Sequence, residues 1–143
     1  MSDAMPALLS RRNARLAAGA VAGLRVLIGT AALAAPRLVL SPWIGGEDAA
    51  SSGAKLLGRS VGARDIGLGA GALLAMRHDT PVRGWVEAGA LSDVGDAVAS
   101  MIAFPRLAPK TRWGVLAMTL AAVAAGALIA PCVDRSEDDS DDD

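Results

Sequence analysis

The chain has 143 residues, enough for one domain, and its formal net charge is −1. A charge balance so close to zero gives no reason to expect a nucleic-acid partner. Hydrophobic residues make up 52% of the chain but aromatic residues only 3%. This is unusual for a soluble core, which normally contains more Phe, Tyr and Trp. The single cysteine, Cys132, excludes an internal disulfide, and without a CxxC or zinc-type spacing we expect no metal and no cofactor.

The first segment, residues 1–15, is predicted to be a polar, basic N-terminal arm. Its arginines just before the first apolar run are Arg11, Arg12 and Arg15. Positive residues in this place favour a cytoplasmic N-terminus. A cleaved secretory signal is an alternative, because small residues at Ala34 and Ala35 follow the apolar run. Arg25 interrupts that run, which argues against cleavage.

Four apolar stretches follow, and each is about as long as the ~20 residues that a helix needs to cross a bilayer. They cover residues 16–35, 56–76, 84–104 and 113–131. Short basic turns at 77–83 and 106–112 allow consecutive stretches to run antiparallel. The predicted fold is therefore all-α, an antiparallel up-and-down bundle of four transmembrane helices within residues 16–133.

Two polar segments complete the predicted organisation. The connection at 37–54 contains Pro42 and Trp43, and an indole in this place is typical of the membrane interface. Residues 134–143 are too acidic to order themselves, so we expect a disordered, solvated tail. An even number of spans puts both termini on the cytoplasmic side of the cell membrane. Charged residues still make up 20% of the chain, which keeps a soluble helical bundle open as an alternative.

Charged residues inside the predicted spans are the main candidates for a site. A charge at the bilayer centre costs about 2.5 to 3.5 kcal/mol, so several must find partners there. Counted inward from Met76 and Gly84, Arg64 and Asp96 are each twelve residues deep, so an antiparallel hairpin would bring them together. Arg25 lies at a depth from which it can approach Asp93 or Asp65. The predicted intramembrane cluster is Arg25, Arg64, Asp65, Asp93 and Asp96.

This cluster has two interpretations. In the first it is structural, and the arginines clamp the carboxylates so that four marginal helices find one register. In the second it is functional, because two cations face three carboxylates and the surplus negative charge could take up a proton or a small cation. Anion or lipid headgroup binding by the arginines is a third possibility.

Glycines spaced four residues apart predict close contacts between helices, because small-xxx-small patterns let backbones approach. The candidates are Gly19, Gly23, Gly58, Gly62, Gly67 and Gly71. Two of these glycines, Gly67 and Gly71, fall in the segment Gly67-x-Gly69-x-Gly71, which lacks the preceding strand of a nucleotide-binding loop. We therefore interpret them as packing residues.

The segment from Gly58 to Gly69, with Arg59, Arg64 and Asp65, and the segment from Ala88 to Asp96 together resemble small bacterial four-helix membrane proteins. These are families of unknown function that are loosely similar to the DoxX-like group. The resemblance covers most of residues 25–104 and implies a four-helix membrane fold. It implies no reaction and no ligand.

No nucleophile, acid-base pair or metal set specifies an enzyme, so we expect a non-enzymatic protein. The leading hypothesis is an accessory or assembly protein of the cell membrane, in contact with lipid and with a membrane protein partner or further copies of itself. The alternative is a small transporter or proton-coupled carrier that uses Asp93 and Asp96.

Overall fold

The computed structural model describes residues 10–107, 109 and 111–135. Within these residues the chain forms five α-helices and two short 3-10 helices, and no strand. The prediction of an all-α protein is confirmed. Residues 1–9 and 136–143, which make up most of the predicted arm and tail, lie outside the described part.

Helix α1 covers Arg11–Ala34 and begins five residues earlier than the predicted span. The Ser10 side chain caps it by accepting a hydrogen bond from the backbone N–H of Asn13 at 3.3 Å. The last residues of the predicted arm, 11–15, are therefore helical. The helix ends before Pro36, because a proline disfavours helical geometry in the residue that precedes it.

The connection to the next long helix contains a helix of its own, which the sequence analysis did not predict. Helix α2 covers Pro36–Ile44, with Pro36 in its first turn, where a proline is tolerated. It ends at Gly45, whose φ of 91° suits a residue without a side chain. The 3-10 helix η2, Asp48–Ala50, then leads to α3.

Helices α3 and α4 form the central hairpin of the chain. Helix α3 covers Ser52–Arg77, and the Ser51 side chain caps it by accepting from the N–H of Ala54. Helix α4 covers Arg83–Ala103. The turn between them lies within the predicted 77–83 segment and contains Asp79 at a φ of 50°.

The last part of the chain contains the 3-10 helix η3, Phe104–Arg106, and helix α5, Arg112–Ile129. Pro105 lies in η3, just after the end of α4. Near the C-terminal end of α5, Pro131 follows within a turn. Both helix ends fall within two residues of the predicted ones.

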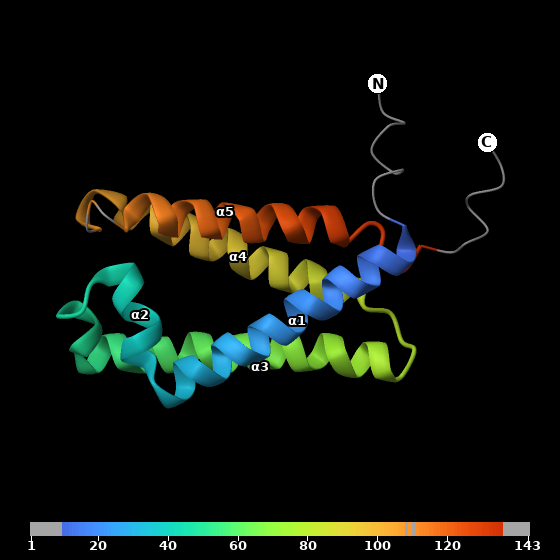
Figure 1. Ribbon diagram of the computed structural model, residues 1–143, viewed down its shortest axis with the longest axis horizontal. Coiled ribbons are helices and arrows are strands. Elements are labelled where there is room, and N and C mark those ends of the chain that lie inside the picture. Colours follow the sequence, from blue (N-terminus) through green and yellow to red (C-terminus); the bar gives the residue numbers. More distant parts are fainter. Residues whose placement is uncertain (1–9, 108, 110, 136–143) are drawn as a thin grey trace, which may run out of the picture.

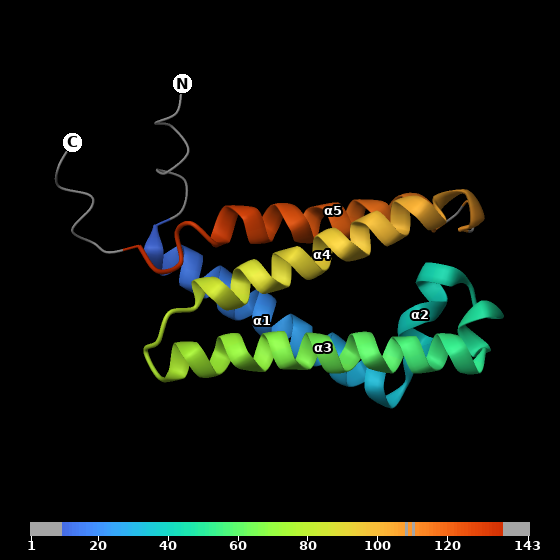
Figure 2. The ribbon, with the colours of Figure 1, turned by 180° about the vertical axis from the view of Figure 1, so that it is seen from behind.

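The four long helices run alternately in opposite directions (Figure 1). Helix α1 packs mainly on α3, and α4 packs mainly on α5. Seen from behind, α1 crosses α3 obliquely and reaches the end of α5 (Figure 2). Both described chain ends and the α3–α4 turn lie at one end of the molecule, whereas α2 lies at the other. We call these the terminal end and the α2 end.

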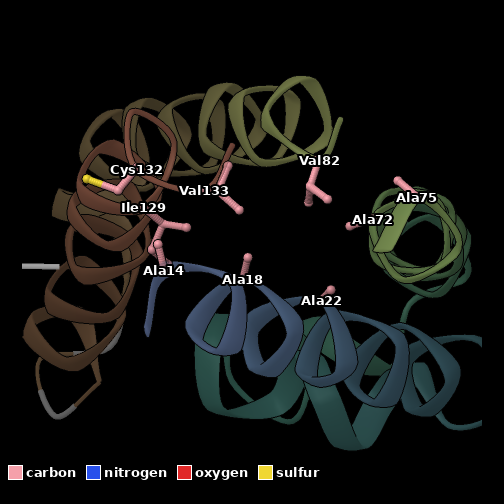
Figure 3. Packing of buried hydrophobic residues seen from close by; sticks show 9 residues of the cluster. All are labelled: Ala14, Ala18, Ala22, Ala72, Ala75, Val82, Ile129, Cys132 and Val133. Carbon is pink, nitrogen blue, oxygen red and sulfur yellow. The ribbon is translucent and has the colours of Figure 1, made fainter. Parts of the chain in front are cut away.

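Small side chains form the hydrophobic core, which lies at the terminal end (Figure 3). Alanines of α1 and α3 face Val82, Ile129 and Val133 there. Val82 and Val133 are the largest fully buried side chains among the described residues. Cys132 is a free, buried thiol of the same core. The helices therefore approach closely and bury little apolar volume.

Large apolar side chains lie on the outside of all four long helices instead. The most exposed of them include Leu27, Leu57, Leu91, Ile102 and Trp113. By length and composition, α1 and α5 could each cross a membrane. Helices α3 and α4 carry additional charges along their length, which lower their hydropathy.

Candidate functional site

The structure brings all five predicted cluster residues together. Three helices supply them, namely α1 (Arg25), α3 (Arg64 and Asp65) and α4 (Asp93 and Asp96). Their ion pairs follow one another in a line of alternating charge, in the order Asp93, Arg25, Asp65, Arg64, Asp96. We call this line the charge chain.

Arg25 organises the more buried half of the charge chain. Its Nη2 donates to Asp93 Oδ2 at 2.5 Å and to the Gly89 carbonyl oxygen at 3.1 Å, while Nη1 donates to Asp65 Oδ1 at 3.3 Å. The side chains of Arg25, Asp65 and Asp93 are 14%, 14% and 11% exposed. One guanidinium thus joins α1 to both α3 and α4. The close approach of Arg25 to the Gly89 backbone explains the glycine there, because an added Cβ would lie 3.2 Å from Nη2.

Arg64 organises the more open half. Its two terminal nitrogens donate to the two oxygens of Asp96, at 3.2 and 2.9 Å, in the paired geometry that suits guanidinium and carboxylate. It also donates to Asp65 Oδ1 at 3.1 Å. The Arg64 and Asp96 side chains are 32% and 29% exposed, about twice as much as those around Arg25.

The charge chain contains two arginines and three carboxylates, so its formal charge is −1. Every cation in it contacts two carboxylates, and Asp65 is shared by both arginines. Removing one partner from such a group strands a buried charge, which typically costs about 3 to 5 kcal/mol. The arrangement therefore links α1, α3 and α4 by ion pairs.

Two separate cavities meet the charge chain. One, of about 30 Å³, lies among α1, α3, α4 and α5, with Arg25 and Asp93 in its wall. Its volume suffices for one or two water molecules. The other, of about 190 Å³, lies at the α2 end and has Asp96 in its wall. The two carboxylates of α4 thus adjoin different cavities, Asp93 the smaller one and Asp96 the larger one.

Three of the six predicted packing glycines lie at tight helix contacts, namely Gly58, Gly62 and Gly71. An added Cβ at Gly62 would lie 2.7 Å from the Gly29 carbonyl oxygen, and one at Gly58 would lie 2.8 Å from Leu40. At Gly71 it would overlap the Trp85 ring.

The other three predicted glycines do not lie at tight helix contacts, so for them the prediction is wrong. An added Cβ would meet no atom within 4 Å at Gly23 or Gly67, and only ordinary contact with Met76 at Gly19. The sequence analysis also missed contacts at Gly29, Gly69 and Gly126, which abut Gly62, Ala22 and Ala90. A spacing of four residues identifies a row of small side chains on one face of a helix. It does not tell which neighbouring helix, if any, packs against that row.

A second polar contact, at Asp134, was not predicted from the sequence. This carboxylate accepts hydrogen bonds from the backbone N–H groups of Val82 and Arg83, at 2.7 and 2.8 Å, and so caps α4 from outside the helix. It also lies 3.6 Å from Arg15. The predicted disordered tail therefore includes at least one residue that joins three segments of the chain.

The first turn of α4 also carries a surface ion pair. Glu87 lies one turn into α4 and accepts a hydrogen bond from Arg83 Nε at 2.6 Å. This hydrogen bond raises the pKa of Arg83, which lies just before the predicted span. Both side chains are at least half exposed, so the pair contributes little to stability.

No group of three or more His, Cys, Asp or Glu residues in the described part of the chain could hold a metal ion. Comparison of the chain with models of known protein families, with curated proteins and with solved structures finds no match. The resemblance to DoxX-like proteins therefore stays a prediction, and the case for a function depends on the geometry described above.

Proposed function

We propose that the protein is a four-span integral membrane protein whose charge chain holds the helices in register. In this proposal it acts as a non-enzymatic accessory or assembly protein in the cell membrane, with both termini in the cytoplasm. The carrying observation is the distribution of polarity, since large apolar side chains lie outside and an ion-paired group lies between the helices. Soluble monomers rarely expose large apolar patches, so large apolar side chains exposed on every long helix favour a lipid environment.

The charges in the middle of α3 and α4 are compatible with this proposal because Arg64, Asp65, Asp93 and Asp96 each have an ion-pair partner between the helices. Intramembrane charges normally face the interior and pair with one another. The exposed side chains of the same helices, such as Leu57, Leu73, Leu91 and Ile102, are suited to lipid. The same apolar exterior argues against the soluble bundle.

Cysteine labelling in intact membranes tests the spans. In a Cys132→Ala background, Leu91→Cys places a thiol in the middle of α4 at a position that is 73% exposed. We expect a membrane-impermeant maleimide to leave it unmodified, because lipid covers it. The matched control, His78→Cys, lies in the exposed α3–α4 turn and should label from the cytoplasmic side. Labelling of Leu91→Cys as fast as His78→Cys would contradict the transmembrane assignment of α4.

Purification from mild detergent after crosslinking tests the accessory role. The exposed apolar faces could pack against a partner as well as against lipid, so a membrane protein or a second copy should be recovered in a defined ratio. Recovery of single, uncrosslinked chains alone would count against this role.

A small transporter or proton-coupled carrier is the second candidate. It is favoured by the surplus carboxylate of the charge chain and by the two separate cavities that reach Asp93 and Asp96. Asp93→Asn and Asp96→Asn would then abolish a flux measured in vesicles. Preservation of that flux in both variants would exclude the carrier mechanism.

A further inference from the structure

The cavity at the α2 end, the larger of the two that meet the charge chain, has the features of a binding site. It measures about 190 Å³ and lies between α2, α4 and the start of α5. Most of its wall is apolar, and its polar groups come from one face of α4. The residues that matter for its chemistry are Trp43, Asp96, Ser100, Ala103 and Val115.

Ser100 is the first indication that a ligand belongs in this cavity. The residue is only 7% exposed, yet its hydroxyl makes no hydrogen bond within the described part of the chain. Serines in a helix commonly donate to the carbonyl four residues earlier, as Ser41 and Ser60 do here. Among the described residues, only Arg112 Nε is a fully buried polar side-chain atom without a partner, so the Ser100 oxygen is accessible from the cavity. The Ser100 hydroxyl is therefore an unused donor and acceptor in the cavity wall.

Asp96 is the second indication. It lies one helical turn before Ser100, so both side chains face the same cavity. Arg64 occupies one site on each of its oxygens, and a carboxylate has further lone pairs to offer. Because the charge chain has one more carboxylate than arginine, the polar end of the cavity favours a positive group.

The composition of the wall restricts which cation fits. A hard metal ion such as Ca²⁺ takes six to eight oxygen ligands, whereas this cavity offers one carboxylate and one hydroxyl. An anion would be repelled by Asp96. An apolar wall that includes an indole suits a ligand with a hydrocarbon body, and indole rings also attract ammonium groups.

We propose that this cavity binds a small lipophilic amine in its ammonium form. The ammonium group donates to Asp96 and Ser100, and the hydrocarbon body lies against Trp43 and Val115. The inference requires the fold and the cavity, and it is independent of the accessory role.

Three probes with the same hydrocarbon body and different head groups test the proposal. Hexylammonium, 1-hexanol and hexanoate are titrated into the full chain in a neutral detergent. Trp85→Phe and Trp113→Phe leave Trp43 as the only tryptophan, so its fluorescence reports on the cavity. We expect a saturable change with hexylammonium, binding of hexanol at least about 10-fold weaker, and none of hexanoate. Equal affinity for hexylammonium and hexanol, or no saturable binding of hexylammonium, would overturn the proposal.

Substitutions within the wall separate this site from general partition into the micelle. Ser100→Ala removes one hydrogen bond and should weaken hexylammonium binding about 3- to 10-fold. The matched control is Ser92→Ala, on the same helix but outside the cavity wall, and it should change nothing.

A cavity-filling change provides a test that leaves the polar groups in place. Ala103→Leu occupies the cavity while keeping Asp96, Ser100 and the ion pair to Arg64, so it should abolish binding without unfolding the chain. Hexylammonium binding that survives both Ser100→Ala and Ala103→Leu at full affinity would show that the amine binds elsewhere.

Discussion

The terminal end of the molecule contains the apolar core, whereas the α2 end contains the cavity that adjoins Asp96. At the terminal end, alanines of α1 and α3 pack against Val82, Ile129 and Val133, and Asp134 ties the chain ends to the α3–α4 turn. At the α2 end, a cavity of about 190 Å³ separates α2 from α4 and α5. The apolar core thus lies at one end, and the cavity that contains Asp96 and Ser100 lies at the other.

The charge chain extends from one environment into the other. Its Arg25 half is well buried and adjoins the small cavity next to the core, while its Arg64 half adjoins the open cavity. The cavity beside Asp96 has room for several water molecules, whereas the one beside Asp93 has room for one or two, so an unpaired charge is better screened at Asp96. The same type of ion pair should therefore contribute more to stability in the buried Arg25 half than in the Arg64 half.

The largest effect is expected from Arg25→Met, which strands the buried Asp93 and removes one partner from Asp65. We expect the free energy of unfolding to fall by about 3 to 5 kcal/mol. Denaturant unfolding of the full chain in neutral detergent, followed by circular dichroism, measures it. The control Arg59→Met removes an exposed arginine that donates to the Leu33 carbonyl oxygen and should cost under about 0.5 kcal/mol. Equal losses in both variants would contradict the role assigned to burial.

The next effect is expected from Gly62→Ala at the contact between α1 and α3. Its Cβ would lie 2.7 Å from the Gly29 carbonyl oxygen, and the backbones must separate to admit it. Overpacking of this kind costs about 1 to 3 kcal/mol. Gly67→Ala, on the same helix with open space around it, should instead stabilise the chain by up to about 1 kcal/mol, because alanine favours helix. Thermal unfolding of the two variants measures the contrast, and destabilisation by both would show that the helix contact is misplaced.

A smaller effect is expected from Arg64→Met on the open side. Asp96 then faces the cavity, and Asp65 keeps Arg25, so we expect a loss of about 1 to 2 kcal/mol. The same denaturant experiment gives the value. A loss as large as that of Arg25→Met would remove the distinction between the two halves.

The smallest effect is expected from Asp134→Ala, which removes the carboxylate cap from the N-terminus of α4. Loss of a cap costs about 1 kcal/mol. Hydrogen exchange at the backbone N–H groups of Val82 and Arg83 should accelerate, because Asp134 is their acceptor. Arg135→Ala, at the next, exposed position, is the control, and equal acceleration there would contradict the cap.

Much of this fold is accessible from local patterns in the sequence. Apolar runs bounded by prolines define the long helices, and counting residues inward from the helix ends pairs Arg64 with Asp96, because both helices rise by the same distance per residue. Helix α2 was missed because it is short and contains Pro36 and Pro42. Its existence depends on contacts with α1 and α3 that no local pattern records.

Contacts between residues far apart in the chain could not be predicted from local patterns. Spacing identified glycine stripes but chose Gly23 and Gly67, which face open space, and passed over Gly29 and Gly69, which carry contacts. Composition predicted a solvated tail from residue 134, although Asp134 has backbone donors 51 and 52 residues earlier in the chain. The cavity beside Ser100 depends on the position of α2 and could not be predicted without it.

A double-mutant cycle between Arg25 and Asp93 tests the central claim, that the charge chain is a structural clamp. The free energy of unfolding is measured in neutral detergent for the original chain, Arg25→Met, Asp93→Leu and the double variant. The account predicts that each single change destabilises strongly and that the double variant recovers a large part of the summed loss, since neither charge is then left unpaired. Purely additive losses, or an Asp93→Leu variant as stable as the original chain, would contradict the clamp.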